Sequence, residues 1–213
     1  MTACEGKENQ KLDYSIEVRD RLIYDFMTGL FDKLMSLISL VIAFPVMLLV
    51  ALFIKLEDGG SVFYSQERLG KDGHVFIIYK FRSMRVDAEK NGAQWAVTDD
   101  DRVTKVGKFI RKTRLDELPQ LFNILTGHMK LIGPRPERPE LAEEFYKELP
   151  EFVNRLAIKP GLTGWAQVNG GYDITPREKL VFDVEYIEKR GLLLDFRIIL
   201  KTVGIVFSGD GAR

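Results

Sequence analysis

The chain has 213 residues, with 31 basic and 31 acidic side chains and 46% hydrophobic residues. This length predicts one domain with appendages, and the zero formal net charge argues against a general nucleic-acid binder. Cys4 is the only cysteine, which excludes an intramolecular disulfide, and two histidines are too few for a histidine-rich zinc site.

The first predicted element is a long apolar helix. Residues 1–21 are polar and of mixed charge, so they do not form a signal peptide. From Leu34 to Ile54, 21 residues carry no charge, and Lys33 and Lys55 bracket them. A helix of that length can cross a hydrocarbon core of about 30 Å, so hydropathy alone predicts a spanning anchor.

Pro45 lies near the middle of this apolar run, where it removes a backbone hydrogen bond and clashes with the preceding turn. Basic residues flank the run on both sides, so the usual cytoplasmic excess of Lys and Arg gives no orientation. A helix that breaks at Pro45 and leaves the bilayer on the face it entered explains both features. A spanning helix with a proline kink is the alternative.

A β-hairpin and two helices are expected next. Residues 61–66 and 75–81 are rich in β-branched and aromatic side chains, and the Asp72-Gly73 pair between them signals a reverse turn. Apolar residues at helical spacing predict a helix over 104–112. A second helix is expected to begin near Asp116, with a proline in its first turn, where that residue is tolerated.

Three more helices are predicted toward the C-terminus. Residues 140–149 form a short acidic helix. Thr175-Pro176-Arg177-Glu178 combines an N-cap threonine, a first-turn proline and the glutamate of a capping box, and the helix it starts runs to about Arg190. Leu192 to Phe207 is strongly apolar, which fits either a core helix or a helix in the lipid interface.

The chemistry is expected between Arg102 and Arg138, where nine basic residues stand against three acidic ones. Such an excess in a neutral protein favours an anionic ligand, and a basic face toward anionic lipid headgroups is the alternative. The sequence contains neither a dinucleotide-binding glycine motif nor a P-loop, so oxidoreductases and P-loop NTPases fit poorly.

Asp116-Glu117 lies inside this basic stretch. Asp116 fits the N-cap of the next helix, and a helix N-terminus with nearby cations would lower its pKa and keep it ionised. An ionised Asp can attack phosphorus and form an aspartyl-phosphate-type intermediate. Adjacent helical positions point about 100° apart, so one carboxylate can attack while the other binds metal or orients a partner.

Arginine and lysine side chains offer anion ligands near this pair. In Gly133-Pro134-Arg135-Pro136, two prolines restrict the backbone, so Arg135 loses less entropy on binding a phosphate. Lys80 and Arg82 follow one face of the second hairpin strand, where they either line an anion site or face water. For Arg135 the alternative is an ordinary surface loop.

Several motifs in this order resemble the monotopic phosphoglycosyl transferases, bacterial sugar transferases that initiate exopolysaccharide, O-antigen or glycan assembly. The resemblance runs from about Tyr24 to Ala212. The motifs are Phe63-Tyr64-Ser65-Gln66-Glu67-Arg68, Lys80-Phe81-Arg82-Ser83-Met84, Arg111 through Gln120, Asn123, Gly133-Pro134-Arg135-Pro136-Glu137, and Lys159 through Gly170.

The resemblance implies a mostly helical α+β fold with a small β-hairpin and interfacial amphipathic helices around the active site. We expect a polar segment over 1–21, a re-entrant membrane helix over 22–58 broken at Pro45, and a cytoplasmic catalytic domain over 59–213. The implied location is the bacterial inner (cytoplasmic) membrane. Members often carry Ser before the helix-breaking proline, where this chain has Phe44.

The resemblance also implies Mg²⁺ and a two-step reaction. Asp116 would attack the β-phosphate of a UDP-sugar and expel UMP, and polyprenyl phosphate would then accept the sugar phosphate. Glu117 would assist metal binding or acceptor activation, so both carboxylates are the expected metal ligands. The expected substrate- and phosphate-binding residues are Arg111, Arg135, Lys80, Arg82 and Arg68.

Two other function classes stay open at this point. One is a non-enzymatic membrane adaptor whose basic face binds anionic lipid and whose Asp116 is only a cap. The other is a membrane-bound hydrolase of lipid phosphates with an aspartyl intermediate. The sugar, the oligomeric state, and the choice between a short-form enzyme and the catalytic domain of a long form are not readable from the residues.

Overall fold

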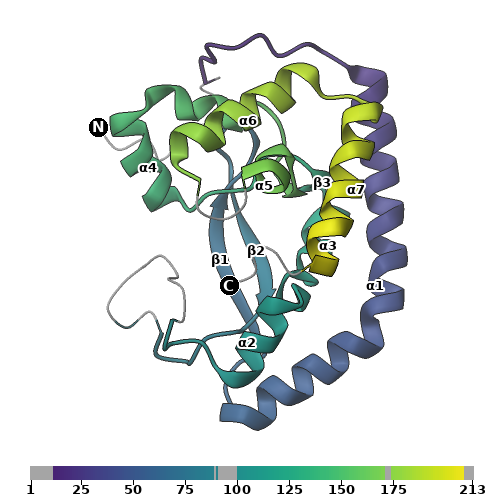
Figure 1. Cartoon of the computed structure of the whole chain (residues 1–213), viewed down its shortest axis with the longest axis vertical. Coiled ribbons are helices and arrows are strands. Elements are labelled where there is room, and N and C mark those ends of the chain that lie inside the picture. The colour runs from purple at the N-terminus through teal and green to yellow at the C-terminus, as the bar shows by residue number, and fades with distance from the viewer. Residues whose placement is uncertain (1–11, 89, 91–99, 171–173, 209–213) are drawn as a thin grey trace.

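The structure is a computed structural model that describes residues 12–88, 90, 100–170 and 174–208. Its longest element is helix α1, Leu22–Asp58, whose 37 residues continue through Pro45 to a left-handed Gly59 with a φ of 71°. Figure 1 shows α1 along one side of the molecule, changing direction part-way. Within the described ranges α1 alone is long and apolar enough to cross a membrane, judged by length and composition only.

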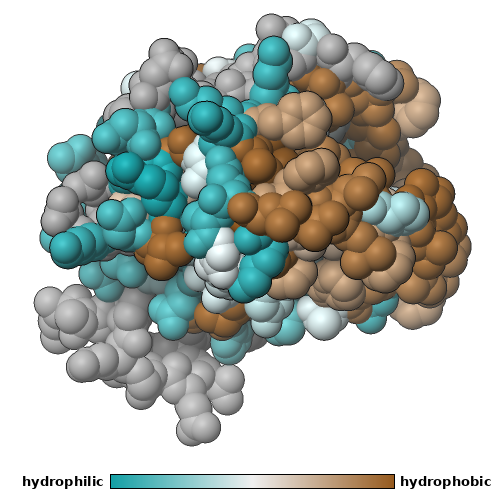
Figure 2. All heavy atoms as spheres, turned by 90° about the horizontal axis from the view of Figure 1, so that it is seen from below, coloured by the Kyte–Doolittle hydropathy of each residue, from teal (hydrophilic) through white to brown (hydrophobic). Residues whose placement is uncertain are grey.

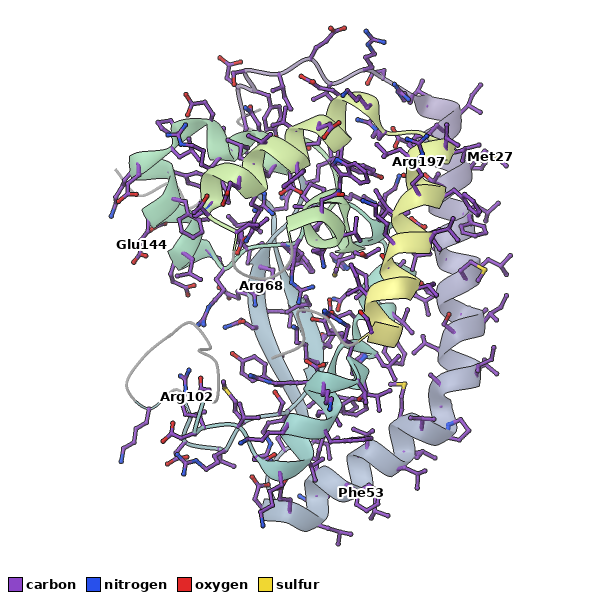
Figure 3. The ribbon with its side chains drawn as sticks, viewed as in Figure 1. Met27, Phe53, Arg68, Arg102, Glu144 and Arg197 are labelled. Atoms are coloured by element: carbon purple, nitrogen blue, oxygen red, sulfur yellow. The ribbon has the colours of Figure 1, made fainter. Side chains whose placement is uncertain are left out.

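One stripe of α1 faces the rest of the protein and the remainder is exposed. The stripe repeats every three or four residues on both sides of Pro45, as one face of a helix requires. Its buried members are Asp32, Ser36, Leu40, Met47, Val50 and Ile54. On the opposite side lie exposed residues such as Val41 and Phe53, and Met27 projects outward in Figure 3.

The predicted hairpin is confirmed. Strands β1, Phe63–Leu69, and β2, Val75–Phe81, pair antiparallel in a register from Phe63 opposite Phe81 to Leu69 opposite Val75. The short 3₁₀ turn Lys71–Gly73 joins them (η1), and both Asp72 (φ 56°) and Gly73 (φ 78°) adopt left-handed conformations there. Asp and Gly tolerate this region, so the turn chemistry expected from the sequence holds.

Helix α2, Lys105–Lys112, is confirmed, with the Thr104 side chain accepting from the backbone of Gly107. The helix expected near Asp116 begins later: α3 covers Gln120–Leu125 and its N-cap position is Pro119. A separate 3₁₀ turn, η2, covers Leu115–Glu117. The prediction that Asp116 caps a helix is therefore wrong, because the chain makes this extra turn before α3 starts.

A second, smaller sheet was not predicted. Strand β3, Lys130–Ile132, pairs parallel with β4, Gly161–Thr163. Between them lie α4, Pro139–Glu148, which matches the expected acidic helix, and the 3₁₀ segment η3, Pro150–Ala157. The short helix α5, Trp165–Gly170, follows β4 directly.

Two helices complete the mostly helical fold. Helix α6, Pro176–Lys189, begins with the predicted capping box at Thr175. Helix α7, Leu192–Ser208, lies alongside α1 (Figure 1) and contacts it through Asp195, which accepts a 2.6 Å hydrogen bond from Tyr24. Figure 2 shows hydrophobic side chains gathered on the side of the molecule where α1 and α7 lie.

Candidate active site

The Asp116-Glu117 pair sits on a tight reversal of the chain. Arg114 adopts a left-handed conformation with a φ of 56°, directly after α2 and its C-cap residue. A non-glycine residue rarely adopts this conformation, and such residues concentrate at functional sites. The reversal forms turn η2, which lies against strand β2.

Glu117 is held by two cations from different parts of the fold. Its Oε1 accepts a 3.0 Å hydrogen bond from the Lys80 ammonium of β2, and the Arg135 guanidinium donates to both carboxylate oxygens. Burial disfavours the charged form, yet the charges of Arg135 and Lys80 hold the pKa of Glu117 well below its usual range. Glu117 is therefore a fixed carboxylate.

Asp116 is buried, with 9% of its surface exposed. Across the described part of the chain its carboxylate has no hydrogen bond or ion pair, in contrast to Glu117. Burial, followed by the negative charge of Glu117, raises the pKa of Asp116 to about 6. The expected lowering of the Asp116 pKa is therefore wrong. Nearby cations act in that direction, but they do not outweigh burial and the neighbouring carboxylate. No α-helix starts at this position either. The group is still mostly ionised at pH 7.

Lys80 reaches Glu117 because β2 is held in place from its outer edge. The Asn123 side chain of α3 donates to the Ile77 carbonyl at 2.6 Å and accepts from the Tyr79 backbone at 3.2 Å. It therefore substitutes for a neighbouring strand just before Lys80. The sequence placed Asn123 in a motif, but no local pattern indicated this bridging role.

Arg111 approaches the site from α2. Its Nε donates a 2.7 Å hydrogen bond to the Ser83 hydroxyl, and its charge lowers the pKa of Asp116. Gly107, one helical turn earlier, packs so tightly that an added Cβ would overlap the Ser83 carbonyl. The close backbone contact at Gly107 thus sets how near α2, and with it Arg111, lies to Ser83.

The remaining predicted phosphate ligands, Arg68 and Arg82, have other partners than the two carboxylates. Arg68 on β1 bonds Gln66 at 2.7 Å and lies close enough to Arg135 to feel its charge; burial and that charge lower the pKa of Arg68 to about 10. Arg82 forms an ion pair with Asp58 at the end of α1, so it and Lys80 serve different partners despite their spacing of two. Pro45 lies inside α1, whereas Asp116 and Glu117 belong to turn η2.

The site fits one mode of magnesium binding. Proteins commonly hold Mg²⁺ with one or two carboxylates, substrate phosphates and several waters. Asp116 and Glu117 offer two carboxylates, whereas the described ranges contain no cluster of three or more His, Cys, Asp or Glu side chains. The uncommitted carboxylate of Asp116 suits such a shared site better than that of Glu117, because both Glu117 oxygens already accept from cations.

A comparison with known families decides the identity. The family model described as "Bacterial sugar transferase" matches residues 23–209. The chain belongs to this bacterial sugar transferase family. The match covers all but the first residue of α1 and every element of the site, so the family resemblance inferred from the motifs is confirmed.

Three curated relatives show how this sugar transferase compares. It is 47% identical over 195 residues to the UDP-N-acetylgalactosamine-undecaprenyl-phosphate N-acetylgalactosaminephosphotransferase of Aeromonas hydrophila, covering 90% of this chain and 46% of the relative. It is 41% identical over 177 residues to the UDP-glucose:undecaprenyl-phosphate glucose-1-phosphate transferase of Xanthomonas campestris pv. campestris, covering 80% and 37%. It is 39% identical over 198 residues to the exopolysaccharide production protein ExoY of Sinorhizobium fredii, covering 85% and 86%.

The chain spans about half or less of the first two relatives, but most of the third. The names of the first two agree on an undecaprenyl-phosphate acceptor and differ in the sugar.

Proposed function

We propose that this chain transfers a sugar-1-phosphate from a UDP-sugar to polyprenyl phosphate at the membrane surface, through a phosphosugar attached covalently to Asp116. In the first step an Asp116 oxygen attacks the β-phosphorus, and the bond from that phosphorus to the bridging oxygen breaks, so UMP leaves. In the second step an oxygen of polyprenyl phosphate attacks the same phosphorus and expels the Asp116 carboxylate. The product is a polyprenyl diphosphate sugar.

The observation that carries this proposal is the contrast between the two carboxylates. Glu117 is locked by Lys80 and Arg135, whereas the oxygens of Asp116 are uncommitted and ionised at pH 7. Burial without a partner is costly for a carboxylate, so such groups concentrate at functional sites, and a nucleophile needs its lone pairs available. A role for Asp116 as the N-cap of α3 is excluded, because that helix begins at Gln120 and Pro119 occupies its N-cap position.

The surrounding cations suit the charge of the donor. Arg135, Lys80 and Arg111 converge on the carboxylates, where their charges would bind a diphosphate and stabilise the additional charge of the transition state. Mg²⁺ held by Asp116 or Glu117 would supply further neutralisation of the phosphate oxygens when bound. Glu117, fixed in orientation, would either hold that metal or activate the acceptor.

The deciding test is acceptor-free turnover. Wild-type protein in nanodiscs is given radiolabelled UDP-sugar and Mg²⁺ without polyprenyl phosphate, using a panel of glucose, galactose and N-acetylgalactosamine donors. The expected result is about one equivalent of UMP per protein, with label retained on denatured protein, because a covalent intermediate accumulates. Asp116→Asn should insert and melt like wild type but give neither label nor UMP.

The alternatives predict different outcomes. A membrane adaptor releases no UMP with any donor, and a lipid-phosphate hydrolase releases inorganic phosphate from polyprenyl phosphate without using a UDP-sugar. Direct transfer without an intermediate gives glycolipid but no acceptor-free UMP or trapped label. Substantial turnover by folded Asp116→Asn would remove Asp116 from the role of nucleophile.

We also propose that α1 is re-entrant, with both ends on the cytoplasmic side of the inner membrane. At about 1.5 Å per residue the helix is about 55 Å long, far more than a hydrocarbon core of about 30 Å. Near its start Asp25 pairs with Lys130 at 3.3 Å, and at its end Asp58 pairs with Arg82. A crossing helix would place one of these ion pairs, and the domain attached to it, on the wrong side.

Exposed apolar residues support the same arrangement. The outer face of α1 is exposed and apolar, and so are residues of α7 such as Leu193 and Phe196. Figure 2 shows hydrophobic side chains gathered on the side where these two helices lie. Single cysteines at Glu17 and Lys71, in a Cys4→Ala background, test the topology with an impermeant thiol reagent. Both sites should react from the cytoplasmic side only, whereas a spanning helix gives opposite sidedness.

A further inference from the structure

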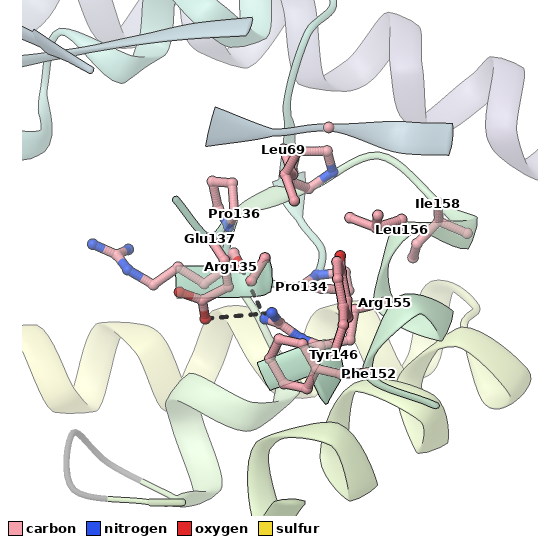
Figure 4. A pocket seen from close by; sticks show the side chains of 13 residues that line it. Leu69, Pro134, Arg135, Pro136, Glu137, Tyr146, Phe152, Arg155, Leu156 and Ile158 are labelled. Carbon is pink, nitrogen blue, oxygen red and sulfur yellow. Dashed lines mark hydrogen bonds and ion pairs between the residues drawn. The ribbon is translucent and has the colours of Figure 1, made fainter. Parts of the chain in front are cut away.

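Arg155 lies behind the proposed site and contacts three different groups at once. Its Nε donates to Asp183 of α6 at 2.5 Å, one terminal nitrogen to Glu137 at 3.3 Å, and the other to the backbone carbonyl of Arg135 at 2.8 Å. The residue is 4% exposed and stacks on the Phe152 ring at 4.6 Å. Figure 4 shows its guanidinium directed at the loop that carries Arg135 and Glu137.

These contacts fix the loop that presents Arg135. The Pro134 carbonyl accepts from Gly161 at 2.9 Å and the Glu137 carbonyl accepts from Leu69 at 2.9 Å, so the loop is pinned at both ends. Between those points the carbonyl of Arg135 itself is held by Arg155. The backbone of Arg135 is thereby fixed on one side while its guanidinium reaches Glu117 on the other.

We propose that Arg155 is a positioning residue for Arg135: it aims the Arg135 guanidinium at the anionic substrate without touching the substrate. The assignment rests on the proposed transferase function. Arg155 reaches two carboxylates and a carbonyl from three separate nitrogens. The three N–H donors of a lysine ammonium share one nitrogen, so lysine is not expected to keep all three contacts. A displacement of about 1 Å at a group that orients substrate can cost about 100-fold in rate.

The test compares two conservative substitutions, Arg155→Lys and Arg190→Lys. Arg190 is a matched control: it is also 4% exposed and bonds backbone carbonyls and a carboxylate, but its partners are Ile187, Arg19 and Asp25. We expect Arg155→Lys to lose about 10- to 100-fold in the kcat/KM for UMP release. Arg190→Lys should keep the wild-type rate.

A double-mutant cycle separates positioning from a general loss of structure. In an Arg135→Ala background, Arg155→Lys should leave the already reduced rate nearly unchanged, because the group it aims is gone. Independent, multiplying losses would overturn the assignment. So would equal rates of Arg155→Lys and Arg190→Lys. If the wild-type protein released no UMP, that result would contradict the proposed transferase function, and with it the positioning role of Arg155.

Lys179→Gln provides a second variant for the case in which Arg155→Lys does not fold. Lys179 is partly exposed and pairs with Glu137 at 2.8 Å, so its loss loosens the same loop without leaving a buried positive charge. We expect a smaller loss of kcat/KM in the same direction, which Arg135→Ala again cancels. Wild-type kinetics in a folded Lys179→Gln protein, together with an unfolded Arg155→Lys, would also overturn the assignment.

Discussion

Two clusters of charge lie on either side of the loop 134–137, and they use similar groups differently. The site cluster consists of Asp116, Glu117, Lys80 and Arg135. The support cluster consists of Glu137, Asp183, Arg155 and Lys179. Each contains two carboxylates and two cations, and the loop contributes one member to each.

The clusters differ in enclosure and in how the carboxylates are used. In the support cluster the Arg155 and Asp183 side chains are 4% and 1% exposed, and both carboxylates are paired. In the site cluster the Arg135 side chain is 33% exposed and Asp116 has no ion-pair partner within the described ranges. Full pairing makes a cluster structural, whereas an unpaired carboxylate beside an accessible cation leaves capacity for a ligand.

The largest effect is expected from breaking the support cluster. Asp183→Ala leaves the Arg155 charge buried without its principal partner, so the free energy of unfolding should fall by about 3–5 kcal/mol. Thermal unfolding in nanodiscs measures this change. Glu17→Ala removes an ion pair whose side chains are 67% and 80% exposed, and it should change stability little. A stable Asp183→Ala protein would contradict the structural role of this cluster.

A slightly smaller effect is expected from Arg135, and on rate rather than on stability. Arg135→Ala should lose about 2–4 kcal/mol of transition-state stabilisation, because the donor that we propose for the phosphate is removed. Arg135→Lys should recover only part of the rate, since an ammonium cannot reproduce the bidentate fork. Steady-state UMP release measures both variants, with thermal unfolding as the control. Wild-type kinetics in Arg135→Lys would argue against bidentate binding.

The smallest effect sharpens the comparison within the site cluster. Glu117 raises the pKa of Asp116, so Glu117→Gln removes this contribution and also frees two cations to stabilise the Asp116 carboxylate. Both changes favour the charged form of Asp116, so its pKa should fall from about 6 by about one unit or more. NMR of carboxyl-labelled aspartate in metal-free protein measures the titration. A higher pKa in the variant would show that Glu117 does not contribute in this way.

Local sequence signals predicted the elements that local interactions determine. The hairpin and α6 carry their turn and capping residues within a few positions, so the sequence was sufficient for both. The β3–β4 sheet joins two three-residue strands about 30 positions apart, where no local pattern exists. The start of α3 was placed too early because Arg114 adopts a left-handed conformation, which its residue type does not signal, and the extra turn η2 follows it.

The same distinction applies to the charged groups. Asp116-Glu117, Lys80 and Arg135 were chosen as site residues, and the structure brings them together. The sequence could not separate Lys80 from Arg82, since the difference arises from Asp58 arriving beside Arg82. The support cluster was missed, although Asp183 offered a signal: it occupies the buried face of α6 between Leu180 and Ile187, where a carboxylate needs a partner.

The inner stripe of α1 has a consequence for how this protein can be made and assembled. Leu40, Met47, Val50 and Ile54 belong to one hydrophobic core with residues of β2 and α3 such as Phe81 and Leu121. Removing α1 would therefore expose the interior of the catalytic region rather than trim an anchor. With α1 placed in the membrane as proposed, its partition into lipid and the completion of the core become a single event. A soluble fragment beginning at residue 59 is expected to aggregate.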